Sequence, residues 1–171
     1  MKLMIIFTFL ATIASCALIP SWRYRREPLT MLRENYLGKQ VRTDGIYTYK
    51  NSSSKFSFFL YTNGIILREF CLDIASKNID EVIEYLKVLP HNHPCQDIVY
   101  AGGVFKIEGS EIKIEKWMSG ANWDTYYTRK YDGNIINDTT ICINKWHTNG
   151  CDTFHFTALP VKPDSTNLFI K

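Results

Sequence analysis

The sequence has little excess charge and few of the motifs that mark enzymes. It contains 20 lysine and arginine residues against 17 acidic residues, which gives a formal net charge of +3. A nucleic-acid-binding domain is usually much more basic, so we expect no nucleic-acid partner. The chain also lacks a Gly-x-Ser-x-Gly elbow, a Ser-x-x-Lys motif and a phosphate-binding glycine loop. An enzyme is therefore the minority interpretation, and we expect no cofactor and no bound metal.

Long apolar runs are scarce as well. The run from Leu3 to Leu10 is shorter than the ~20 residues that a membrane-spanning helix needs. Lys2 precedes this run, and the small residues Ala14 and Ser15 follow it. This order of a cation, an apolar stretch and small residues is typical of a secretory signal peptide, and it predicts an exported protein.

The end of the signal resembles the bacterial lipobox. Ile13, Ala14 and Ser15 precede Cys16, which in that motif is the lipid-bearing first residue of the mature chain. The resemblance implies an anchor at Cys16 and a place in the bacterial cell envelope, at the outer membrane. Ordinary cleavage after Ala17 is the alternative. We expect a signal peptide over residues 1–16, a tether over residues 17–27 and a single β-rich domain over residues 28–171.

Alternating apolar and polar residues fill most of the mature chain. We expect eight or nine short strands in hairpin order, with no alternation of strands and helices. An up-and-down antiparallel sheet that curls into a small barrel fits this order best, because closure removes exposed edges. One amphipathic helix is expected at Lys77–Leu89, between the third and fourth strands, and a second short helix at Pro28–Gly38.

Four turns set the expected strand registers. Asn63-Gly64 predicts a two-residue type I′ turn between Phe56–Thr62 and Ile65–Cys71. A turn at Gly109-Ser110 pairs Glu108 with Glu111 and places Phe105, Ile107, Ile112 and Ile114 on one face. Asp132-Gly133 is expected to end a strand. A turn at Asn149-Gly150 pairs Ile143 with Phe156 and makes Ile141, Ile143, Phe154 and Phe156 an inward set.

The signal, the aromatic hairpin, the helix and the stretches GVFKIEGSEIKIEKW and YDGNIINDTT together resemble lipoproteins of the Bacteroidetes. Some of those proteins have lipocalin-like β-barrel domains. The resemblance implies an envelope-facing barrel that could hold an apolar ligand, and it supplies no catalytic residues.

Four cysteines remain if Cys16 is lipidated, and they allow two disulfides in three connectivities. Cys71 and Cys95 flank the helix and form the natural candidate pair. The expected hairpin register keeps Cys142 and Cys151 far apart, which excludes both a disulfide between them and a zinc site shared with His147 and His155. His91, His93 and Cys95 could also bind zinc, but we interpret them as a loop.

Aromatic residues make up 14% of the chain and are the candidate ligand-lining residues. A packed β core is the competing interpretation. We expect a lipid-anchored protein that binds a small apolar ligand or another envelope protein. The alternatives are a hydrolase with a cleft of histidines and carboxylates, and a secreted, non-lipidated domain with disulfides, which the sequons at Asn51 and Asn137 would suit. The candidate lining residues are Tyr47, Tyr49, Phe59, Tyr61, Trp117, Trp123 and Tyr126.

Overall fold

A computed structural model describes six stretches of the chain: residues 25–50, 55–68, 77–88, 102–119, 125–144 and 150–171. Several residues singled out above lie outside these stretches, and their predictions stay as stated. They are the signal peptide with Cys16, the candidate disulfide Cys71–Cys95, the histidines His91, His93 and His147, and Trp123.

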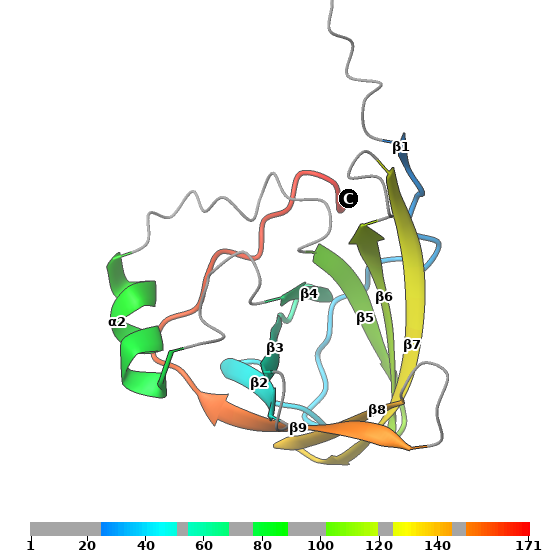
Figure 1. Ribbon diagram of the computed structural model, residues 1–171. Coiled ribbons are helices and arrows are strands. Elements are labelled where there is room, and N and C mark those ends of the chain that lie inside the picture. The colour runs from blue at the N-terminus through cyan, green and yellow to red at the C-terminus, as the bar shows by residue number, and fades with distance from the viewer. Residues whose placement is uncertain (1–24, 51–54, 69–76, 89–101, 120–124, 145–149) are drawn as a thin grey trace, which may run out of the picture.

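The described chain forms a closed antiparallel barrel of eight strands, as the sequence predicted (Figure 1). Each strand pairs with its neighbours in the chain, and β9 closes the barrel by pairing with β2. A two-residue strand, β1 (Arg25–Arg26), pairs in parallel with the start of β7. The barrel strands are β2 (Gly45–Lys50), β3 (Lys55–Leu60), β4 (Ile65–Arg68), β5 (Gly102–Glu108), β6 (Glu111–Ser119), β7 (Thr125–Asn137), β8 (Thr140–Asn144) and β9 (Cys151–Ala158).

The β5–β6 hairpin has the predicted register. Glu108 lies opposite Glu111, and Gly109 takes the positive φ that the tight turn requires. The two facing carboxylates are tolerated because Lys113 bonds Glu108 at 2.6 Å and Lys106 lies 3.5 Å from it. The predicted inward residues form part of the barrel interior, where Phe105, Ile112 and Ile114 are buried and Ile107 is partly buried.

The β3–β4 hairpin is also present, with a loop one residue longer than predicted. Leu60 lies opposite Ile66, and the Tyr61 amide donates to the Ile65 carbonyl, so Thr62–Gly64 form a three-residue loop. Gly64 has a φ of +78°, a backbone conformation that glycine adopts readily and other residues rarely do. A three-residue loop that ends in a left-handed glycine is the next commonest hairpin after the two-residue type.

The predicted turn at Asp132-Gly133 is wrong, because β7 runs through it without interruption. Gly133 lies between Ile112 of β6 and Ile143 of β8, at the point where β7 pairs with both neighbours. A Cβ atom at Gly133 would approach the Cys142 carbonyl oxygen to 2.5 Å. The glycine therefore permits close packing between strands and does not mark a turn.

The predicted β8–β9 register is also wrong. Ile143 lies opposite Asp152 in place of Phe156, and residues 145–150 form the connection. Side chains alternate between the two faces of a strand, so a shift by four residues leaves the predicted inward residues on the inner face. Ile141, Ile143 and Phe154 are accordingly buried.

This register brings Cys142 and Cys151 together in a disulfide, which the sequence argument had excluded. Their Cα atoms are 5.5 Å apart, a normal separation for a disulfide. The predicted two-residue turn would have kept the two cysteines apart, whereas the longer connection between β8 and β9 brings them within reach of each other across the ladder. Since both sulfurs are covalently joined, neither is available as a thiolate ligand for zinc.

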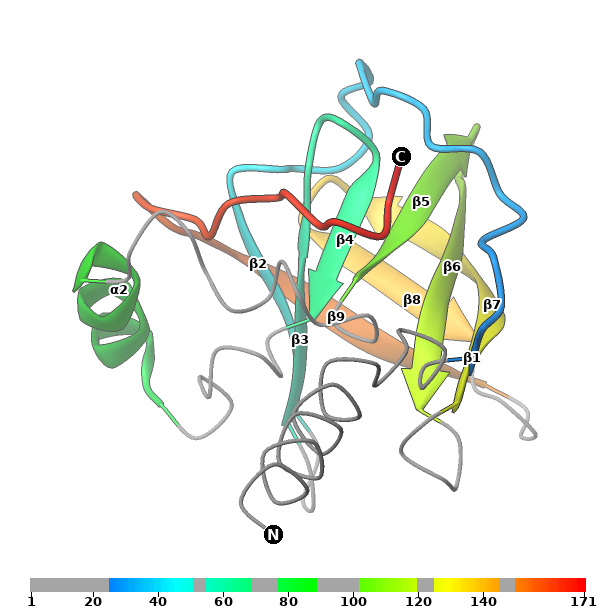
Figure 2. The ribbon, with the colours of Figure 1, turned by 90° about the horizontal axis from the view of Figure 1, so that it is seen from above.

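The amphipathic helix is confirmed as α2 (Ile79–Val88), which lies against the outside of the barrel (Figure 2). It begins with a capping box, because the Asn78 side chain accepts from the Glu81 amide and the Glu81 carboxylate accepts from the Asn78 amide. Val82 and Leu86 are buried against Ile46 and Phe59. The helix therefore covers part of the outer face of β2 and β3.

The predicted helix at Pro28–Gly38 is wrong, since this segment is an irregular strap along the barrel. Leu29 and Met31, two residues apart, both pack against the outer face, a spacing that an extended chain allows and a helix does not. The carboxylate of Glu115, which is fully buried, accepts bonds from the Thr30 amide, the Thr30 hydroxyl and the Met31 amide. These bonds replace those that a short, marginal helix would have made.

The C-terminal segment, residues 159–171, crosses the outside of the barrel beyond β9 (Figure 1). Lys162 donates to the carbonyl oxygens of Thr43 and Leu60 and lies 3.8 Å above the Tyr61 ring. Ile170 joins Trp117 and Tyr126 in an outer cluster. Because the strap and this segment cover the outer face, several strands are buried on both sides. The three apolar clusters draw all their members from residues 29–170.

Candidate ligand cavity

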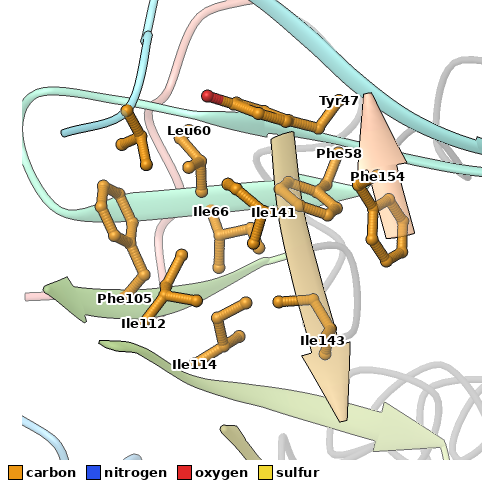
Figure 3. Close-up of a cluster of buried hydrophobic side chains, with 11 residues drawn as sticks. Tyr47, Phe58, Leu60, Ile66, Phe105, Ile112, Ile114, Ile141, Ile143 and Phe154 are labelled. Atoms are coloured by element: carbon orange, nitrogen blue, oxygen red, sulfur yellow. The ribbon is translucent and has the colours of Figure 1, made fainter. Parts of the chain in front are cut away.

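The barrel is packed at one end and hollow at the other. At the packed end six side chains fill the interior, and Figure 3 shows inward-pointing side chains from facing strands in contact with one another. These six are Val41, Tyr47, Leu60, Phe105, Ile112 and Ile141. The Tyr47 hydroxyl closes this end by donating to the Asp138 carbonyl oxygen and accepting from the Arg42 amide.

The hollow end contains an open cavity of about 400 Å³. This volume lies within the range of small-molecule sites. Five side chains of the inner cluster form its floor: Phe58, Ile66, Ile114, Ile143 and Phe154. Toward the mouth the lining changes to larger and more polar residues, namely Phe56, Ser57, Arg68, Lys116, Met118, Tyr131, Asn144 and Asp152.

Aromatic contacts fix the floor of the cavity. The Phe58 and Phe154 rings are tilted with their centroids 4.8 Å apart, and Tyr47 stacks on the other side of Phe58 at 5.5 Å. Tyr49 packs against Phe154 at 5.6 Å. Aromatic pairs at such distances stabilise a fixed arrangement, so the cavity floor is built before any ligand arrives.

Lys116 is the charged residue of β6 that lines the cavity. Inner-facing residues alternate along that strand, so Lys116 follows Ile112 and Ile114 on the lumen side. Its ammonium lies 4.8 Å from the centroid of the Tyr131 ring. Burial, and to a smaller extent the nearby cations Arg68 and Arg129, together lower the pKa of Lys116 to about 7.

The residues that the sequence suggested as lining lie elsewhere in the barrel. Tyr47 is in the packed end, and Tyr49 supports Phe154 from outside the cavity. Phe59 packs against α2, Trp117 and Tyr126 pack beneath the strap and the C-terminal segment, and Tyr61 packs between these two outer clusters. The burial of Phe59, Trp117 and Tyr126 comes from the covering of the outer face, which the sequence pattern did not reveal.

The alternation of side chains could have identified the true lining. Phe58 lies on the face of β3 opposite to Phe59, and Lys116 lies on the face of β6 opposite to Trp117. Since Ile112 and Ile114 were correctly placed inward, the same alternation places Lys116 in the lumen. Arg68 could not have been found in this way, because the predicted two-residue turn pairs it with Phe59, whereas the longer loop places it opposite Phe58 on the lumen side.

The described residues offer no cluster of metal ligands. His155 is exposed on the outer face of β9, opposite Thr48 and Thr140, and does not enter the cavity. Within the described stretches no three histidine, cysteine or carboxylate side chains converge as metal ligands.

No helix in the described part of the chain is long and apolar enough to cross a bilayer. No protein-family model matches the chain, and neither a curated protein nor a solved structure matches it.

Proposed function

We propose that this protein is a lipid-anchored envelope protein whose barrel binds a small apolar ligand non-covalently. The observation that carries the proposal is the open cavity of about 400 Å³ with an apolar floor at one end of the barrel. A barrel of eight strands is just wide enough either to be filled by side chains or to hold one small ligand. Among the described residues, side chains fill one end of this barrel, and the space they leave at the other end suits a ligand.

The proposed anchor accords with the position of the N-terminal segment. β1 pairs with Thr125 and Tyr126 at the start of β7, and Tyr126 lies opposite Ser119 at the end of β6. Lys116 and Met118, near that end of β6, line the cavity mouth. A chain that continues from β1 to a lipid on Cys16 would therefore leave the barrel at its open end.

Filling the cavity tests the binding function. We would titrate the chain from Ala17 onward, which contains every member of the three apolar clusters, with the neutral fluorescent probe N-phenyl-1-naphthylamine. Ile114→Phe places a larger ring in the cavity and should weaken binding about tenfold. Ile136→Phe makes the same change at a residue that is 62% exposed and should leave binding unchanged.

Met118→Trp provides a second filling variant if Ile114→Phe does not fold, because Met118 lies at the mouth and is only partly buried. Equal binding by both filling variants and the control would refute the proposal, as would no binding by the unmodified chain. The anchor is tested by the mass of the mature N-terminus, where an acylated Cys16 is expected and an unmodified later residue would remove the anchor.

A further inference from the structure

The mouth of the cavity carries two cationic side chains, Lys116 and Arg68, and one carboxylate, Asp152, above an apolar floor. Lys116 lies directly opposite Arg129 of β7, and the pKa of Lys116 also responds to Arg68 of β4. Like charges directly opposite one another destabilise a sheet. The barrel therefore carries an electrostatic cost at this site.

The surroundings of Lys116 do not relieve that cost. Its ammonium contacts the Tyr131 ring, and among the described residues it takes part in no salt bridge. Gly103 of β5 lies opposite Lys116 on the other side and presents no side chain to it. A half-buried ammonium without a salt-bridge partner is unfavourable, so an anion at this position would be stabilised.

We propose that the cavity takes a single-chain amphiphile with an anionic head group, whose chain lies on the floor and whose head group lies at Lys116. This inference rests on the proposed binding of an apolar ligand and adds the charge of that ligand. A methylene group is about as large as a water molecule, whose volume is about 30 Å³. A cavity of about 400 Å³ therefore has room for about a dozen chain atoms.

Competition with ligands of matched length tests the charge preference. Decanoate, decanol and decyltrimethylammonium would each displace N-phenyl-1-naphthylamine from the chain beginning at Ala17. A charge-assisted contact predicts that decanoate binds about tenfold or more tightly than decanol, and that the cation binds most weakly. Lys116→Met should abolish the preference for decanoate while decanol still binds. Lys130→Met, on the exposed outer face of β7, should preserve the preference.

The outcomes separate this inference from the proposed function. If decanol and decanoate bind equally to the unmodified chain, the anionic head group is refuted and the apolar cavity stands. If Lys116→Met keeps the preference, Lys116 is not the head-group site. If neither ligand nor probe binds, both proposals fail.

The pH dependence offers a second readout. Lys116 faces Arg68, Arg129, Tyr131 and Asp152 across the cavity mouth, and its pKa is lowered to about 7. The preference for decanoate should therefore be strongest near about pH 6, where Lys116 is charged, and weaken above about pH 8. The same preference at both pH values in the unmodified chain would contradict the role of Lys116.

The ligand could come from solution or from a membrane. Residues 17–24 span at most about 28 Å when extended, so an anchor on Cys16 would keep the mouth close to the bilayer. Lysophosphatidylglycerol in phosphatidylcholine vesicles would test the membrane source, and decanoate below its micelle concentration tests the dissolved source. Binding from either source that depends on Lys116 supports the inference, whereas binding that ignores the Lys116→Met substitution in both overturns it.

Discussion

Replacing Glu115 by glutamine should destabilise the protein by releasing the strap from the barrel. Glu115 is fully buried, and its carboxylate accepts from the Thr30 amide at 2.9 Å, the Thr30 hydroxyl at 2.9 Å and the Met31 amide at 2.5 Å. One oxygen, Oε2, accepts from both amides. In the Glu115→Gln variant the amide oxygen can still accept from both backbone amides while the NH₂ group donates to the Thr30 hydroxyl, so what is lost is the negative charge that strengthens the three bonds.

The magnitude follows from the strength of the bonds, because a hydrogen bond to a charged group contributes about 1.5–3 kcal/mol and one between neutral groups about 0.5–1.5 kcal/mol. A loss of about 1 kcal/mol in each of the three bonds predicts a fall of about 3 kcal/mol in the free energy of unfolding. With a urea dependence of about 1.5–2 kcal/mol per molar, the unfolding midpoint should fall by about 1.5–2 M.

Urea unfolding followed by circular dichroism measures this change, and amide hydrogen exchange at Thr30 and Met31 locates it. Glu111→Gln, an exposed residue on the same strand, is the matched control and should change stability little. The reasoning is refuted if Glu115→Gln shifts the midpoint no more than the control, or if exchange at Thr30 and Met31 stays slow.

Three further predictions concern other parts of the fold. Replacing both Cys142 and Cys151 by serine should cost about 2–3 kcal/mol, as expected for a loop of this length, and a non-reduced peptide map should show the two joined; separate peptides would contradict the β8–β9 register. Lys116 is charged below about pH 7 in the folded chain but up to about pH 10 when unfolded, so the unfolded state binds more protons in between and stability should rise with pH there. Lys162, whose pKa is lowered to about 8, adds to the rise above that pH, so Lys116→Met should remove chiefly the rise between about pH 7 and 8 in urea unfolding, and an unchanged pH profile would count against it. Asn78→Ala removes the helix cap and should cost about 1 kcal/mol in thermal unfolding, where no loss would argue against the capping box.

The sequence predicted the barrel because its hairpins carry local signals. In β5 and β6 the alternation continues on both sides of a tight turn, so the pattern fixed the register residue by residue. The β8–β9 hairpin has the same kind of signal at Asn149-Gly150, yet an even shift leaves the inward face unchanged. The alternation of apolar and polar residues is the same in both registers, so it could not choose between them. It also could not show whether Gly133 marks a turn or permits close packing between strands.

The lining of the cavity was harder to predict because the outer face of the barrel is covered as well. The strap and the C-terminal segment have no periodic pattern, so nothing in the sequence showed that Trp117 and Phe59 would be buried outside the lumen. Aromatic abundance therefore pointed to the wrong side of the strands for these two residues. The charge of Lys116 argued for an exposed residue, whereas its position in the alternation placed it inside.

The most direct test of the cavity as a ligand site is a crystal structure of the protein with 12-bromododecanoate. The bromine marks the end of the chain through its anomalous signal. Binding in the proposed orientation predicts a bromine peak on the cavity floor, among Phe58, Ile114 and Phe154, with the carboxylate at Lys116. A bromine peak only on the outer surface, or a cavity without the ligand at saturating concentration, would contradict it.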